Sequence, residues 1–182
     1  MTTIKAISDN HFFHENIIRY CNRPFQSNDD MTEQMIRMWN ESVEPTDIVV
    51  HMGDFVCGGS FSRLKEVVDQ LNGYKILITG NHDGHSVTRF RRAGFDRVFK
   101  HRWSLGMYTF SHRFQTKEYL EEVGSRYNLH GHTHKHQYGD PYFSFCVDVI
   151  GYNPVPVKVD LTEEQLKNES GISTPEIYTR VI

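Results

Sequence analysis

The sequence predicts an α/β fold with two sheets, within a single domain that spans residues 1–182. In the first half, three short apolar runs each lead into a polar loop, and segments with helical periodicity separate them. This βαβ alternation makes neighbouring strands parallel. In the second half, short strand-like runs follow one another without long helices, which favours a second sheet. The length suits one domain, with a core over about residues 4–160 and a C-terminal tail over 161–182.

The first half contains the regular part of the pattern. Strands are predicted at 4–7, 47–52 and 74–79, and helices at 12–20, 62–71 and 86–93. The strands are apolar along most of their length, as a sheet covered on both faces requires. A longer helix is expected to begin near Asp30, where Glu33 would complete a capping box, and to stop near Ser42.

The second half predicts shorter elements. Strands are expected at 97–99, 107–111, 127–129, 143–149 and 155–159, and a short helix is expected from Thr162. No repeat, low-complexity tract or long linker divides the chain.

Composition excludes several classes of protein. The formal net charge of -3 provides no global positive field for nucleic acid. No apolar run is long enough for a membrane span, and the N-terminus has no apolar signal-peptide core. Three cysteines without a C-x-x-C unit indicate reduced thiols. We therefore expect a cytoplasmic protein.

Polar side chains with metal-binding atoms follow five of the predicted strands. They are Asp9, His11, Asp54, Asn81, His82, His112, His132 and His134. Any one of them alone fits an ordinary turn, but ligands collect where the strands of an α/β fold end. Carboxylate, imidazole and amide together suit Mn²⁺ first, with Fe, Zn²⁺, Ni²⁺ and Mg²⁺ as alternatives. The seven residues other than His82 are too many ligands for one tetrahedral ion. They suit two ions if Asp54 bridges them.

Electrostatics indicate the chemistry of such a site. Two divalent ions and two carboxylates leave a net charge of about +2, which favours an anionic substrate. A pair of metals also clamps a phosphoryl group for in-line displacement. His82 is the predicted donor of a proton to the leaving oxygen, with Asp83 orienting its ring.

The ordered blocks resemble those of the calcineurin-like metallophosphoesterases. The blocks are Asp9-Asn10-His11, Gly53-Asp54, Gly80-Asn81-His82-Asp83, His112 and Gly131-His132-Thr133-His134. The resemblance runs from Ile4 to about Val149, and the stretch 11–25 is similar to small bacterial and phage members. It implies a two-sheet β sandwich flanked by helices. The Gly53-Asp54 block lacks the following arginine of large protein phosphatases, which argues against that role.

The resemblance also implies roles for individual residues. One metal would be held by Asp9, His11, Asp54 and His134, the other by Asp54, Asn81, His112 and His132, and His82 would be the acid. The expected function is a two-metal phosphoester hydrolase, either a phosphodiesterase or a phosphatase, in which a metal-bound hydroxide attacks phosphorus.

The expected substrate is a phosphorylated small molecule, a nucleotide or a nucleic-acid end. Arg23, Arg113 and His14 are candidate substrate contacts, with loop anchoring the alternative for Arg23 and a salt bridge the alternative for Arg113. The alternative function is a non-catalytic scaffold of the same fold, as in some relatives within protein-sorting complexes. A metallo-β-lactamase-like site would need an H-x-H-x-D-H block, which 132–136 does not provide.

Overall fold

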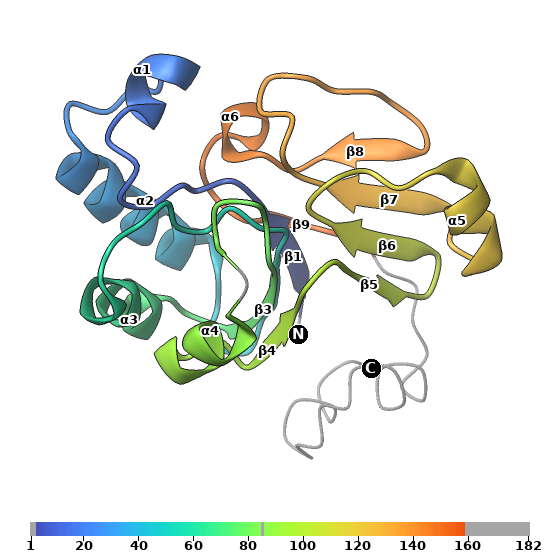
Figure 1. Ribbon diagram of the computed structural model, residues 1–182, viewed down its shortest axis with the longest axis horizontal. Coiled ribbons are helices and arrows are strands. Elements are labelled where there is room, and N and C mark those ends of the chain that lie inside the picture. The colour runs from blue at the N-terminus through green and yellow to red at the C-terminus, as the bar shows by residue number, and fades with distance from the viewer. Residues whose placement is uncertain (1–2, 85, 159–182) are drawn as a thin grey trace.

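The computed structural model describes residues 3–84 and 86–158, and it consists of two mixed sheets flanked by helices (Figure 1). The strand order is β4-β3-β2-β1-β9 in the first sheet and β5-β6-β7-β8 in the second. Helices α2, α3 and α4 lie on the outer side of the first sheet, and α5 lies beyond the second (Figure 1). The predicted two-sheet α/β fold is confirmed.

The first sheet contains most of the predicted parallel strands. Its members are β1 (Ile4–Ile7), β2 (Ile48–His51), β3 (Tyr74–Ile78), β4 (Arg97–Phe99) and β9 (Val155–Pro156). The first four are parallel, and β9 runs antiparallel to β1. The crossover helices are α2 (Asn28–Ser42), α3 (Phe61–Gln70) and α4 (Val87–Ala93). Because β1, β2 and β3 are parallel, the loops after them meet at one edge.

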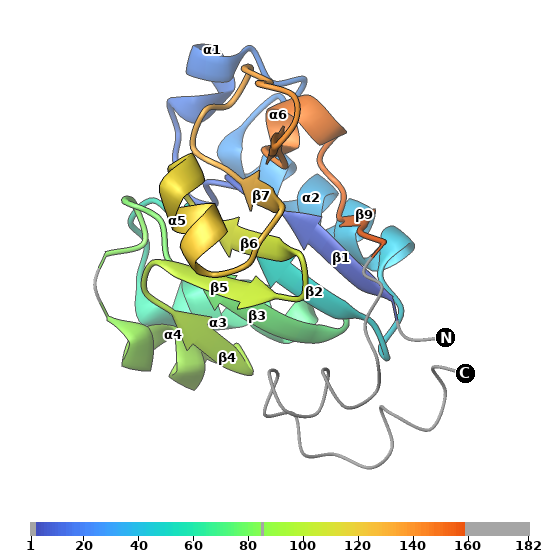
Figure 2. The same cartoon turned by 90° about the vertical axis from the view of Figure 1, so that its right-hand side faces the viewer.

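The second sheet combines a hairpin with two parallel strands. In Figure 2 its strands lie in front of those of the first sheet. Its strands are β5 (Arg102–Leu105), β6 (Tyr108–Ser111), β7 (Tyr127–His130) and β8 (Tyr142–Ser144), with α5 (Lys117–Glu122) between β6 and β7. Strands β5 and β6 are antiparallel, whereas β6, β7 and β8 are parallel. The loops after β6 and β7 therefore also share an edge.

Alternate residues of the central strands enter two separate cores. Ile7, Val49 and Leu77 pack against the helices. Neighbouring side chains in the same strands, such as Val50 and Ile76, pack against Phe110 and Leu129 of the second sheet. Both faces are thus covered, which explains the nearly unbroken apolar sequence of these strands.

Two helix predictions need correction at the N-terminal side. The expected helix at 12–20 is only α1 (Ile17–Cys21), because Phe12 is extended and bridges to Val56. The N-cap of α2 is Ser27 rather than Asp30, since the Ser27 hydroxyl accepts the Asp30 backbone N–H. The Asp30 carboxylate accepts the Gln26 backbone N–H instead.

The region 143–149 was predicted wrongly as one strand. It contains the end of β8 and then α6 (Val147–Ile150), because Val147 N–H donates to the Ser8 carbonyl and the chain turns there. Strand β5 and helix α5 were not predicted. Of the strand expected at 155–159, residues 155–156 form β9, and residue 159 lies outside the described part of the chain. The helix predicted from Thr162, the tail 161–182 and His85 lie outside the described residues.

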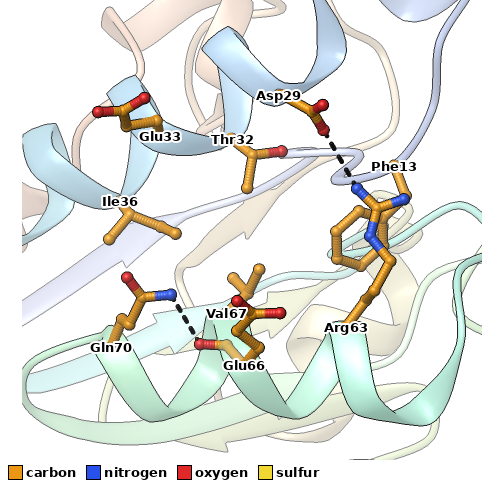
Figure 3. Close-up of a pocket in the computed structure, with 9 residues that line it drawn as sticks. All are labelled: Phe13, Asp29, Thr32, Glu33, Ile36, Arg63, Glu66, Val67 and Gln70. Carbon is orange, nitrogen blue, oxygen red and sulfur yellow. Dashed lines mark hydrogen bonds and ion pairs between the residues drawn. The ribbon is translucent and has the colours of Figure 1, made fainter.

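A groove between α2 and α3 borders the loop that follows β1 (Figure 3). There the Arg63 guanidinium lies 4.5 Å from the centre of the Phe13 ring and 3.2 Å from the Asp29 carboxylate (Figure 3). These contacts join both helices to the backbone two residues after His11. In the two described ranges, every helix is too short or too polar to cross a lipid bilayer.

Candidate metal centre

Five strand-end loops bring the predicted ligands together. The loops after β1, β2 and β3 come from the first sheet, and those after β6 and β7 from the second. Asp9, His11 and His134 form one group whose potential ligand atoms all lie within 4.8 Å of one another. Asp54, His112 and His132 form a second group by the same measure. These groups correspond to the two halves of the implied ligand set.

Asp54 lies between the two groups. Its Oδ2 atom is 3.5 Å from His11 Nε2 and 3.4 Å from His112 Nε2. Its other oxygen accepts the backbone N–H of His82 at 2.8 Å. Burial acts to raise the pKa of Asp54, but the hydrogen bond and charge of His112 outweigh it and hold the pKa well below its usual value. A single ionised oxygen thus faces an imidazole from each half of the site.

Two histidines have their tautomers set by neighbours. His112 Nδ1 lies 2.9 Å from the Met52 carbonyl, which can only accept, so Nδ1 carries the hydrogen. In the neutral ring, the Nε2 lone pair then faces Asn81 Oδ1 at 3.0 Å and Asp54 Oδ2. Three acceptors pointing at one another repel unless a cation or a proton lies between them.

His134 follows the same rule. Its Nδ1 donates to Asp148 Oδ2 at 2.7 Å, and its Nε2 faces Asp9 Oδ1 at 4.0 Å. Burial acts to lower the pKa of His134, but the hydrogen bond to Asp148 and the charge of Asp9 raise it overall. A carboxylate behind a histidine is a common arrangement in metal sites, where it orients the ring and makes it a stronger ligand.

The surroundings of the His11 ring point most clearly to a cation-binding role. Both of its ring nitrogens are buried, and neither hydrogen-bonds with any described residue. Burial lowers its pKa to about 3, so the ring is neutral and keeps a free lone pair. Buried polar groups are nearly always satisfied. The donors gathered around His11 therefore fit a divalent cation.

The backbone of the site is unusual. Five of the implied ligands have φ in the left-handed region: Asp9 (63°), His11 (54°), Asp54 (53°), His132 (70°) and His134 (47°). Such positions cost about 1–3 kcal/mol each and concentrate at functional sites. Backbone bonds from Asp9 N–H to the Gly53 carbonyl (2.9 Å) and from His11 N–H to the Asp54 carbonyl (3.0 Å) hold two of these turns in place.

Two glycines allow the loops to approach one another. A Cβ at Gly131 would overlap Ser8 Oγ and Asp9 Oδ2, and a Cβ at Gly80 would overlap the Asp54 carboxylate. Both glycines precede a predicted ligand, so the G-H-x-H and G-N-H patterns have a steric cause.

Two residues that support Asp9, Ser8 and Cys146, were missed by sequence reasoning. The Asp9 carboxylate accepts hydrogen bonds from His132 N–H (2.9 Å), Cys146 Sγ (3.1 Å) and Ser8 Oγ. The position of Ser8 beside Asp9 was a signal, but no local pattern pointed to Cys146. His51 Nε2 lies 2.9 Å from Asn10 Oδ1, and its Nδ1 accepts Gly53 N–H at 3.2 Å, which fixes the loop that carries Asp54.

Arg23 has an anchoring role. Its Nε and Nη2 donate to Asp148 at 2.9 and 3.0 Å, while Nη1 donates to the Asn10 carbonyl and Nη2 to the Asp9 carbonyl. The Arg23 side chain is fully buried. Because its donors are already used, the anchoring interpretation replaces the one of substrate contact. Burial acts to raise the pKa of Asp148, but hydrogen bonds from His134 and Arg23 lower it to about 2.

Asp83 does not contact the His82 ring, contrary to the expected orienting role. Its buried carboxylate accepts the backbone N–H groups of Phe55 (2.9 Å), Val56 (3.1 Å) and Gly80 (2.8 Å). Because the chain turns between these neighbours, Asp83 points inward and His82 is exposed. Burial raises the pKa of Asp83 to about 6. His82 Nδ1 instead lies 3.4 Å from Cys57 Sγ.

The remaining predicted contacts lie near the site. The His82 ring is 4.9 Å from His11 and 5.8 Å from His14, measured between centroids, so three imidazoles gather beside the first group. Arg113 is exposed and lines a pocket together with His132.

Two known proteins resemble this chain. The uncharacterized protein MJ1445 of Methanocaldococcus jannaschii is 43% identical over 84 residues, which are 46% of this chain and 48% of that protein. The chain thus aligns with about half the length of this curated relative. The crystal structure of AQ665, a protein of unknown function from Aquifex aeolicus, has a TM-score of 0.69 at 21% identity, over 86% of this chain and 96% of that one. This likeness concerns the fold.

A family model described as calcineurin-like phosphoesterase matches residues 2–170. The matched range includes all five loops that supply the convergent carboxylates, imidazoles and amide. The chain therefore belongs to the calcineurin-like phosphoesterase family.

Proposed function

We propose that the protein is a hydrolase that cleaves phosphoesters with two divalent cations, of which Mn²⁺ is the first expectation. Membership of the family supports metal-dependent phosphoester hydrolysis in general. The observation that carries the two-metal form is the position of Asp54 Oδ2, which lies within 3.5 Å of an imidazole nitrogen from each half of the site. Fe, Zn²⁺, Ni²⁺ and Mg²⁺ are the alternative ions.

The donor set divides into two half-sites. Asp9, His11, Asp54 and His134 would hold one ion, and Asp54, Asn81, His112 and His132 would hold the other. When bound, two such ions attract a phosphate and lower the pKa of a water near phosphorus. Asp9 and Asp54 supply two negative charges, so an anionic substrate remains favoured.

His82 is the proposed general acid. Its ring is exposed at the mouth of the site and lies beside His11, while its backbone N–H is tied to Asp54. The imidazole is thus next to the reacting centre but open to solvent, where it can give a proton to the leaving oxygen. His14, whose ring lies 5.8 Å from that of His82, is positioned to contact the substrate.

The exposure of His82 favours a small diester, a nucleotide or a nucleic-acid end, with monoesters also accommodated. A deep binding cavity is not needed for such substrates, because the charge of the two cations would bind the phosphate at the open site.

The test uses the full-length protein with Mn²⁺ and measures hydrolysis of bis-p-nitrophenyl phosphate and p-nitrophenyl phosphate. His82→Ala should lower kcat by about 10²–10⁴-fold, while the bound metal stays at two ions per chain. His101→Ala is the matched control, since His101 is an exposed histidine outside the site. Wild-type protein that binds two metals and hydrolyses neither substrate would leave only the scaffold function.

A further inference from the structure

Beside the second half of the metal centre lies a pocket of about 470 Å³, lined by Arg113, Phe114, His132, Thr133, His136 and Tyr138. This volume lies within the range of about 300–1,000 Å³ that is common for small-molecule sites. The pocket is formed by the loops after β6 and β7, and His132 belongs to both the pocket and the ligand set. We propose that this pocket binds the nucleobase of a nucleotide substrate. The inference rests on the proposed function, because it names the substrate of the same site.

Two exposed aromatic side chains support this assignment. Phe114 is 49% exposed and Tyr138 is 52% exposed, and their ring centroids are 5.3 Å apart. The Phe114 ring also contacts His130, at 5.9 Å, and Tyr142, at 5.5 Å. Both side chains thus pack against neighbouring rings and still remain about half exposed. Bases stack on such platforms with little dependence on sequence, because every base has a π face.

Arg113 supplies an uncommitted positive charge at the same place. It directly follows the ligand His112, and within the described part of the chain its exposed guanidinium makes no hydrogen bond or ion pair. Arg102, in contrast, donates to Gln115 at 3.0 Å and lies 4.0 Å from the centre of the Tyr119 ring. Arg113 can therefore pair with a phosphate oxygen without breaking an existing contact.

The order of these groups matches the parts of a nucleotide. A phosphate at the metal centre would sit near His132, which leads directly into the pocket. In this arrangement Arg113 would pair with the phosphate, and the sugar would lie between the metal centre and the aromatic pair. A sugar phosphate has no ring to stack on Phe114 and Tyr138, so the surface would favour a ligand that carries a base.

The experiment compares adenosine 5′-monophosphate with ribose 5-phosphate, which has the same phosphate and sugar but no base. Binding to Mn²⁺-loaded full-length protein is measured by calorimetry at low temperature, and a phosphate assay checks that each ligand is intact. Stacking at about 1–3 kcal/mol per base predicts roughly 5–150-fold tighter binding of the nucleotide. The double substitution Phe114→Ala and Tyr138→Ala should abolish this ratio and leave the affinity for ribose 5-phosphate unchanged. Arg113→Ala should weaken both ligands.

Phe143→Ala is the control for loss of an exposed ring, because Phe143 is 41% exposed on β8 and does not line the pocket. It should keep the wild-type ratio. Equal binding of the two ligands, or an unchanged ratio in the double variant, overturns the inference. Hydrolysis of bis-p-nitrophenyl phosphate, measured on the wild-type protein, separates this result from a failure of the proposed function, because that ester carries no nucleobase but must still be cleaved at the metal centre.

Discussion

Asp148→Asn is the substitution that best tests how the metal centre is supported. The Asp148 side chain is 2% exposed and accepts three hydrogen bonds, from Arg23 Nε (2.9 Å), Arg23 Nη2 (3.0 Å) and His134 Nδ1 (2.7 Å). Asparagine keeps the shape of the side chain but has one accepting oxygen and no charge. The buried guanidinium of Arg23 would lose its counter-ion, and His134 would lose the group that fixes its tautomer.

The size of both effects can be estimated. Breaking a buried ion pair by removing one partner costs about 3–5 kcal/mol, so the free energy of unfolding should fall by that order. Loss of the carboxylate behind a ligating histidine lowers metal affinity by about 10–100-fold. We expect the loss of affinity at the half-site of Asp9, His11 and His134, because only this half-site contains the His134 ring.

The assay is urea unfolding of metal-free protein, followed by titration with Mn²⁺ at low temperature. Asp29→Asn is the control, since it removes an exposed carboxylate that pairs with Arg63. It should change neither quantity, because exposed ion pairs contribute little. If Asp148→Asn unfolds at the wild-type urea concentration and binds both ions with wild-type affinity, the anchoring role of Asp148 is refuted.

Two further changes test separate parts of the account. Gly131→Ala should reduce bound metal, measured by elemental analysis, because its Cβ would overlap Asp9 Oδ2, whereas a Cβ at Gly139 meets nothing within 4 Å and Gly139→Ala should retain both ions. Asp47→Asn should remove a pH-dependent part of stability. Burial acts to raise the pKa of Asp47, but bonds from Lys5 and two backbone N–H groups lower it overall. A lowered folded-state pKa adds stability above the unfolded-state pKa of about 3.9 that disappears as pH falls through the folded value. Urea unfolding should therefore show a difference between wild type and variant at pH 7 that shrinks towards pH 2, and an equal difference at both pH values would contradict this.

The convergence of the proposed ligands was predictable because strand ends impose geometry. Asp9, Asp54 and Asn81 each follow a parallel strand of one sheet, so their loops had to meet. The same holds for His112 and His132 after β6 and β7. Local sequence was sufficient for these residues, since a short apolar run followed by a polar loop identifies each strand end.

The supporting contacts were not predictable in the same way. Arg23 and Asp148 are separated by 125 positions in the sequence, and neither belongs to a recognisable motif. The alternation of apolar residues around Asp148 also fits a strand, whereas Val147 begins a one-turn helix there. Asp83 follows His82 in the sequence, but its side chain points inward and accepts hydrogen bonds from backbone amides. Tertiary contacts set this orientation, and local sequence does not reveal them.

The most direct test of the central claim is a crystal structure of the Mn²⁺-loaded protein, with anomalous scattering recorded at the manganese edge. The account predicts two anomalous peaks, one on each side of Asp54 Oδ2, with His11 beside one and His112 beside the other. A single peak, or peaks that do not share Asp54, would contradict the two-metal site.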